Sequence, residues 1–162
     1  MGTSIAVRSL TDADRGAIAT WHYGGDLAIY DPGPGAMALR EPDHIALVNT
    51  DGVLLGYGTT GVEARVPGGR YDGDGSDGSD GGCVDLGLGL RPDLVGAGHG
   101  APALLALMAW ASRELRANRF RATIAAVNPR ANGLMRSLGF AQTHRFVRPR
   151  DGRQFVQYER QP

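Results

Sequence analysis

The residues best suited to chemistry are the glycines of the run Gly96-Ala97-Gly98-His99-Gly100. Because glycine lacks a Cβ atom, several backbone N–H groups of such a run can point at one place. An apolar segment of helical spacing follows directly, and a helix N-terminus carries about half a positive charge. The run therefore predicts a binding site for an anion such as a phosphate or pyrophosphate; a glycine-rich turn that only packs a helix on a strand is the alternative.

The segment Cys83–Leu90 before this run has the composition of a strand. Its side chains alternate between two faces. Leucines occupy one face and Asp or Gly the other: Leu86, Leu88 and Leu90 against Asp85, Gly87 and Gly89. Glycines inside a strand are typical of a close approach by backbone or ligand. We predict a face open to a substrate, with Asp85 at its edge; simple packing accommodation is the alternative.

An aromatic and acidic cluster in the first half offers a second binding surface. Its members are Trp21, His22, Tyr23, Asp26, Tyr30 and Asp31. Aromatic faces and carboxylates can together hold a cationic amine. The alternative is that the end of a helix packs its aromatic side chains on the core.

Composition excludes several classes of protein. The 162 residues suit one domain, 1–162, and 17 basic residues balance 17 acidic ones, which disfavours general binding of nucleic acid or of an anionic membrane. The single cysteine, Cys83, excludes an internal disulfide and a cysteine-rich zinc site, and no metal site is expected. All basic residues are arginine, so a Walker A lysine and a Schiff base are excluded. We expect a cytoplasmic protein with no membrane partner.

The elements that must position these residues alternate between strands and helices. Strands are expected at Ser4–Arg8, His44–Asn49, Val53–Thr60, Cys83–Leu90, Arg121–Val127, Thr143–Val147 and Phe155–Tyr158. Helices are expected from Thr11 to Trp21, at Gly98–Ala117 and at Pro129–Leu138, with a structured loop at 24–42. Residues 68–82 are rich in Gly and Asp and predict a flexible loop. The pattern is that of a mixed α/β (α+β) domain.

The glycine run also fits the dinucleotide pattern G-x-G-x-x-A through Gly96, Gly98 and Ala101. That fold requires an acidic residue about 20 residues further on to hold a ribose. The region Asn118–Arg121 has none, and too little chain remains for a doubly wound sheet. A Rossmann-type oxidoreductase is therefore disfavoured.

Several motifs occur in one order: Leu90-Arg91-Pro92, then Val95-Gly96-Ala97-Gly98-His99-Gly100, then Asn128, then Leu138-Gly139-Phe140. Over about residues 83–140 the chain resembles the GNAT superfamily of acetyl-CoA-dependent N-acetyltransferases. The resemblance implies a mixed, mostly antiparallel central sheet of six to seven strands, with a splayed central parallel pair and about four flanking helices.

The resemblance also implies how acetyl-CoA, the co-substrate, would be held. Backbone groups of Leu88, Gly89 and Leu90 would pair with the pantetheine arm. The amides of Val95 to Ala101 would cradle the pyrophosphate: Val95, Gly96, Ala97, Gly98, His99, Gly100 and Ala101. Asn128 would contact the pantetheine or fix a water molecule.

Two positions depart from the family pattern. Val95 stands where the family has Arg or Gln, which removes one side-chain contact to the pyrophosphate but leaves the amides. Met135 stands where many members have a tyrosine that protonates the departing thiolate, and a thioether cannot donate a proton.

The implied reaction is direct attack of a neutral primary amine on the thioester, with no acyl-enzyme. The Leu90 amide would stabilise the negative charge that develops on the carbonyl oxygen. We predict Asp85 as the base, with Glu63 and His22 as alternatives, and Trp21, Tyr23 and Tyr30 as contacts of the acceptor. The acceptor is expected to be a small-molecule or peptide amine, and a homodimer is compatible with the sequence. A non-catalytic acyl-CoA-binding regulatory module is the alternative function.

Overall fold

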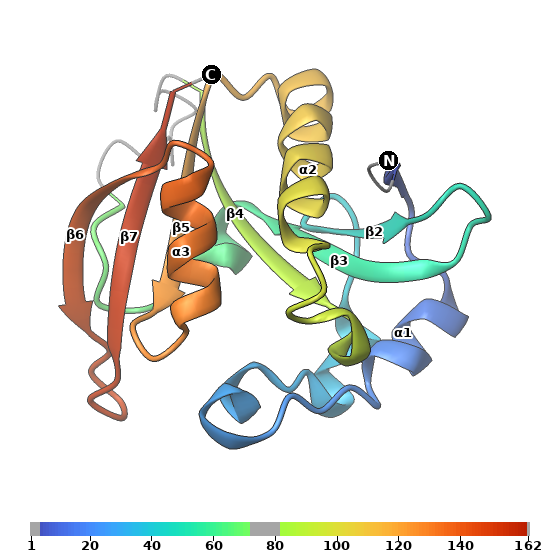
Figure 1. The fold of residues 1–162 in the computed structure, drawn as a ribbon, viewed down its shortest axis with the longest axis horizontal. Coiled ribbons are helices and arrows are strands. Elements are labelled where there is room, and N and C mark those ends of the chain that lie inside the picture. Colours follow the sequence, from blue (N-terminus) through green and yellow to red (C-terminus); the bar gives the residue numbers. More distant parts are fainter. Residues whose placement is uncertain (1–3, 72–81, 162) are drawn as a thin grey trace. The chain divides into compact units, whose positions relative to one another are not determined.

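The computed structural model describes residues 4–71 and 82–161. The predicted Gly/Asp loop at 68–82 therefore lies mostly outside the described residues. Within them the chain forms seven strands, three α-helices and four 3-10 helices. Figure 1 shows these elements along the chain.

All seven expected strands and all three expected helices are present, with ends shifted by a few residues. The strands are β1 (Ala6–Arg8), β2 (His44–Val48), β3 (Leu54–Thr60), β4 (Cys83–Leu90), β5 (Arg119–Ala125), β6 (Ala141–Val147) and β7 (Gln154–Arg160). The helices are α1 (Asp12–Ile18), α2 (Gly100–Glu114) and α3 (Pro129–Ser137), with 3-10 helices η1 (Gly25–Tyr30), η2 (Gly33–Ala38), η3 (Gly61–Ala64) and η4 (Pro92–Leu94). The predicted structured loop at 24–42 thus contains η1 and η2.

The strands follow the order β1-β2-β3-β4-β5-β7-β6 in a mixed, mostly antiparallel sheet, as predicted. Its parallel pair is β4 with β5, and their register runs from Cys83 opposite Arg119 to Leu86 opposite Ala122. Strand β4 then continues to Leu90. The chain packs as two compact units, Met1–Thr59 with Leu88–Ala109, and Thr60–Gly87 with Trp110–Pro162.

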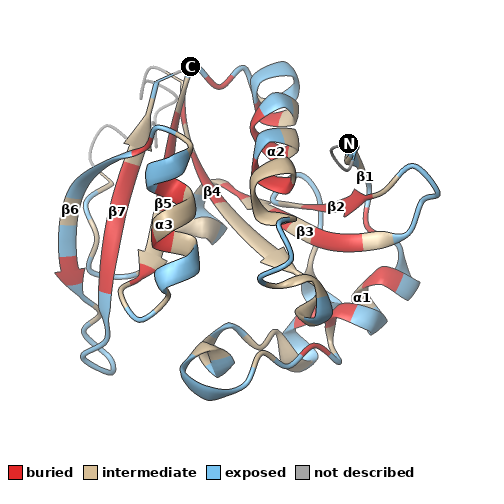
Figure 2. Cartoon of the chain, in the orientation of Figure 1, coloured by how far each residue is buried: buried red, intermediate tan, exposed pale blue. Residues whose placement is uncertain are grey.

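The first unit is built on α1 and the β2–β3 hairpin. Helix α1 begins with a capping box, in which the Thr11 hydroxyl accepts from the Asp14 amide and the Asp14 carboxylate accepts from the Thr11 amide. Its apolar side joins a buried cluster of Leu10, Ile18, Trp21, Ala36, Ala46 and Val48. Figure 2 shows how fully β2 is buried. This cluster fixes where the chain leaves α1.

The turn of the hairpin forms at Asp51-Gly52, between the two expected strands. The Asn49 side chain accepts hydrogen bonds from the amides of Asp51 and Val53, and Gly52 has a φ of 81°. Such positive φ angles favour glycine. The turn therefore sets the register of β2 against β3, with Ile45 opposite Gly58.

The second unit packs α3 against β5 and β7 through one buried amide. The Asn132 side chain donates to the carbonyl oxygens of Ala125 and Asn128, and accepts from the Tyr158 hydroxyl at 2.6 Å. Buried amide groups of this kind are stable only when their hydrogen bonds are made. Asn132 therefore ties the helix to both strands.

None of the helices in the described ranges is both long and apolar enough to cross a lipid bilayer.

Within the first unit, β3 and the end of β4 approach one another at two glycines. A Cβ atom on Gly56 would lie 2.5 Å from the Gly89 carbonyl oxygen, and one on Gly89 would lie 2.5 Å from Cε1 of Tyr57. The Tyr57 ring thus occupies the space above Gly89. For Gly89 this corrects the predicted open face, because the missing side chain makes room for a tyrosine of the neighbouring strand.

Replacement of Gly56 tests this close approach. We expect Gly56→Ala to lower the free energy of unfolding by about 1–3 kcal/mol, because the atom it meets belongs to the backbone and cannot rotate away. Chemical denaturation measures the change. The control is Gly16→Ala in α1, where the added Cβ meets nothing within 4 Å, and we expect no loss of stability there. Equal effects of the two substitutions would contradict the assignment.

Candidate active site

The glycine run lies in a tight turn between η4 and α2. The Val95 amide donates to the Pro92 carbonyl at 3.3 Å, and the Ala97 amide donates to the Leu94 carbonyl at 3.2 Å. Gly96 and Gly98 have φ angles of 79° and 87°, which favour glycine. The turn then leads directly into α2 at Gly100.

Among the described residues, five backbone N–H groups of this turn have no acceptor in the protein. They belong to Gly96, Gly98, His99, Gly100 and Ala101. A phosphate or pyrophosphate fits such a row, because its oxygens accept several hydrogen bonds at a helix N-terminus. Nδ1 of His99 is also buried without a partner, so it too has hydrogen-bonding capacity to spare. The amides of Val95 and Ala97, predicted as part of the cradle, are instead used inside the turn.

The end of β4 presents its backbone groups alternately to its two edges. The Arg91 amide donates to the Leu55 carbonyl of β3 at 2.8 Å, and the Gly89 carbonyl also lies against β3. Successive residues of an extended strand direct their N–H and C=O groups to opposite edges. The N–H and C=O groups of Leu88 and Leu90 therefore point to the other edge. Of the three residues predicted to pair with pantetheine, Gly89 faces the wrong edge for it.

Tyr23 reaches that other edge from the segment after α1. Its hydroxyl donates to the Leu90 carbonyl at 2.6 Å, and its own amide donates to the Asp31 carboxylate at 2.8 Å. The pKa of Tyr23 is raised mainly by burial, and to a smaller extent by the nearby Tyr57 and Asp31. The phenol therefore stays neutral, and it occupies the Leu90 carbonyl that we expected pantetheine to use.

The other members of the aromatic and acidic cluster separate into core and surface. Trp21 is 6% exposed and belongs to the core of the first unit, with its ring 6.0 Å from that of Tyr57, so it is not available to an acceptor as predicted. Tyr30 is exposed. His22 is exposed too, and its Nδ1 lies 3.0 Å from the Asp31 carboxylate. The Tyr23 amide and His22 together lower the pKa of Asp31.

Asp85 lies in the second unit, between two arginines. Arg121 donates from Nε and Nη2 to its two carboxylate oxygens, at 2.6 and 2.8 Å, and Arg65 donates from Nε at 2.9 Å. Asp85 and Arg121 are 2% and 3% exposed. A carboxylate held this way has its oxygens occupied and no route to solvent, so the geometry does not suit the predicted base. We assign Asp85 a structural role.

The remaining predicted residues of the second unit have separate environments. Glu63 is exposed in η3. The Asn128 side chain accepts from the Ala131 amide and caps α3, a role that its position before Pro129 could have revealed. Met135 is buried in α3 and supplies no proton donor.

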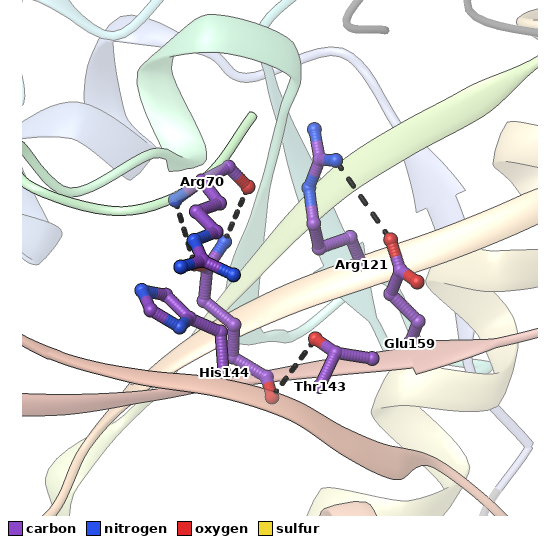
Figure 3. Close-up of a pocket in the computed structure, with 6 residues that line it drawn as sticks. Arg70, Arg121, Thr143, His144 and Glu159 are labelled. Atoms are coloured by element: carbon purple, nitrogen blue, oxygen red, sulfur yellow. Dashed lines mark hydrogen bonds and ion pairs between the residues drawn. The ribbon is translucent and has the colours of Figure 1, made fainter. Parts of the chain in front are cut away.

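A hollow of about 170 Å³ also lies in the second unit (Figure 3). It is lined by Arg70, Arg121, Thr143, His144, Gln157 and Glu159. Its buried polar groups already have partners, since Gln157 exchanges two hydrogen bonds with the Arg70 backbone and Arg121 pairs with Asp85. Sequence analysis missed this network, because its members are far apart in the chain.

Comparison with known proteins agrees with this arrangement. The family model described as "Acetyltransferase (GNAT) domain" matches residues 5–141. The chain belongs to the GNAT acetyltransferase family. Members of this family use acetyl-CoA as the acetyl donor. No curated protein sequence matches the chain.

Solved structures of GNAT proteins share its fold. A GNAT acetyltransferase from Bacillus anthracis superposes with a TM-score of 0.72 at 12% identity, over 99% of this chain and 96% of that one. An aminoglycoside acetyltransferase solved with coenzyme A gives 0.67 at 17% identity, over 98% and 95%. A spermidine/spermine N-acetyltransferase from Vibrio cholerae gives 0.66 at 12% identity, over 98% and 92%. These likenesses confirm the predicted GNAT fold.

The structural role of Asp85 can be tested by Asp85→Asn. We expect the free energy of unfolding to fall by about 3–5 kcal/mol, because the buried Arg121 would lose its bidentate partner and keep only Glu159, whose carboxylate lies 3.8 Å away. Thermal or urea unfolding measures the loss. Glu63→Gln, an isosteric change at an exposed carboxylate, serves as the control and should leave stability unchanged. An Asp85→Asn protein of undiminished stability would return Asp85 to the list of candidate bases.

Proposed function

We propose that this protein is an enzyme that transfers the acetyl group of acetyl-CoA to a primary amine by direct attack. The observation that carries the proposal is the row of unpaired amides at Gly96, Gly98, His99, Gly100 and Ala101. Family membership supports the acetyl donor, and the free amides support a diphosphate-bearing substrate. The nicotinamide alternative still lacks the acidic residue that would hold a ribose.

The chain would hold acetyl-CoA mainly through its backbone. The diphosphate would lie on the five amides, aided by the imidazole of His99. Pantetheine would lie along the edge of β4 that faces away from β3. There Leu88 presents its N–H and C=O groups, and Leu90 presents its N–H group because Tyr23 occupies its carbonyl oxygen. Val95 adds no charge, so affinity would depend on the conformation of the turn.

The reaction would need few side chains. The amine nitrogen would attack the thioester carbon while the Leu90 N–H donates to the carbonyl oxygen, and the C–S bond would break to release coenzyme A thiolate. Cys83 is buried, which is consistent with the absence of an acyl-enzyme. His22, an exposed imidazole held by Asp31, could take the proton of the amine on its way to solvent. The thiolate would leave without a dedicated acid, because Met135 cannot donate.

We further propose a small-molecule amine as the acceptor, in the cytoplasm. Structural neighbours named for their substrates include a spermidine/spermine N-acetyltransferase and an aminoglycoside acetyltransferase. The alternative is a non-catalytic acyl-CoA-binding module. One specific observation favours it: Asp85 is unsuited to the predicted role of base, and Met135 stands where the family has its proton-donating tyrosine.

The amides of the turn can be tested by adding a charge among them. We expect Gly98→Asp to weaken acetyl-CoA binding at least about tenfold, because a carboxylate would repel the diphosphate. Gly98→Asn is the matched control, since Asn has the same shape, tolerates the positive φ and carries no charge. Isothermal titration calorimetry gives both affinities. Equal affinities for the two variants would place the diphosphate elsewhere.

An amine panel then separates an enzyme from a binding module. The panel contains spermidine, the aminoglycoside kanamycin and the simple amine n-butylamine, with release of free thiol as the readout. We expect acetyl-CoA binding, no NADH binding, and thiol release that depends on at least one amine. Binding without release from any of the three would favour the regulatory module.

A further inference from the structure

Tyr23 differs from the other residues of the aromatic and acidic cluster, because its hydroxyl lies at the proposed reaction centre. The hydroxyl is 2.6 Å from the Leu90 carbonyl oxygen. In an extended strand the N–H and C=O groups of one residue point to the same side. Tyr23 therefore lies on the edge of β4 where the Leu90 N–H would meet the acetyl group.

The hydroxyl is held in one orientation. Its hydrogen is committed to the Leu90 carbonyl, while the Asp31 carboxylate holds the backbone amide of the same residue. A hydroxyl that donates its only hydrogen keeps two lone pairs as acceptors. At this position Tyr23 thus offers a fixed, neutral hydrogen-bond acceptor.

We propose that the hydroxyl oxygen of Tyr23 accepts a hydrogen bond from the acceptor amine and aligns the amine lone pair with the acetyl carbon. A neutral primary amine has two N–H groups and one lone pair. If one N–H donates to Tyr23, the lone pair can point in fewer directions. Holding the reacting groups in a productive orientation contributes a large part of the rate acceleration in such reactions. This inference rests on the proposed function, and it gives the contact predicted between Tyr23 and the acceptor a defined chemical role.

Tyr23 keeps its hydrogen throughout the reaction. The C–N bond forms from the amine lone pair, the C–S bond breaks, and its electron pair leaves on the coenzyme A sulfur. The proton lost by the amine nitrogen passes to solvent, and not to the phenol. Tyr23 is thus no substitute for the tyrosine missing at Met135, because protonation of the thiolate would require it to release the Leu90 carbonyl. Burial, which raises its pKa, makes it a still weaker acid.

The experiment compares Tyr23→Phe with Tyr57→Phe. Both variants keep an aromatic ring next to the end of β4, because Tyr23 contacts Leu90 and Tyr57 lies over Gly89. The Tyr57 hydroxyl, in contrast, hydrogen-bonds to none of the described residues. Two rates of thiol release are measured for each: amine-dependent transfer to n-butylamine, spermidine or kanamycin, and hydrolysis of acetyl-CoA without an amine. Calorimetry with acetyl-CoA supplies a readout that does not depend on turnover.

For Tyr23→Phe we expect kcat/KM for the amine to fall about 10- to 100-fold, with hydrolysis and acetyl-CoA affinity within about twofold of wild type. Tyr57→Phe should change none of the three. Equal losses in transfer and hydrolysis would overturn the proposal, because Tyr23 would then act through Leu90 or as an acid. Unchanged transfer would overturn it as well. Wild-type protein that fails to bind acetyl-CoA would instead refute the proposed function, and binding without any amine-dependent release would refute both.

Discussion

The backbone of β4 hydrogen-bonds to β3 at one edge and, in the proposed complex, faces acetyl-CoA at the other. This is possible because the N–H and C=O groups of successive residues alternate in direction. Arg91 and Gly89 face β3, where Arg91 completes its hydrogen bond to Leu55. Leu88 and Leu90 face away from that strand. A slip of one residue in this register would exchange the two sets. The close approach of β3 and β4 needs a glycine at position 56, and the Tyr57 ring fits over Gly89 only in this register. These contacts therefore fix the register, which determines the edge of β4 to which the Leu90 amide points.

A second constraint lies where the same strand begins. Asp85 is almost fully buried, and it is tolerable there only because Arg121 meets both of its oxygens while Arg65 meets one of them again. The ring of Tyr71 lies within 5.1 Å of the guanidinium carbon of each arginine. Glu159, 3.8 Å from Arg121, supplies a second negative charge, so that two carboxylates balance the two arginines. The cluster therefore stabilises the second unit instead of acting on a substrate.

Most of the fold could be predicted from local signals. The apolar alternation of the strands, the Thr11 cap and the Asp51-Gly52 turn are all encoded within a few residues. The glycine run before α2 likewise predicted an anion site, and five of its amides have no acceptor among the described residues. The individual side chains were harder, because their roles depend on partners that are distant in the sequence. No sequence signal near Asp85 predicts its contact with Arg121, and none near Tyr23 predicts its contact with Leu90. Trp21 was misread, and the capping role of Asn128 was missed, for a simpler reason. An aromatic residue at a helix end is also an ordinary core residue, and an Asn before Pro is also an ordinary capping residue.

The bidentate clamp on Asp85 has a consequence for the conditions in which the protein can work. Burial disfavours the charged guanidinium of Arg121, but the hydrogen bonds to Asp85 outweigh that cost and leave the pKa of Arg121 above its ordinary value. A lysine ammonium in its place would have an ordinary pKa near 10.4, close to that of many alkylamines. With arginine, the clamp keeps its charge in alkaline solution, where a growing share of amine molecules has lost its extra proton and become nucleophilic. The ion pair between Asp85 and Arg121 therefore keeps both of its charges at pH values at which alkylamines have already become neutral.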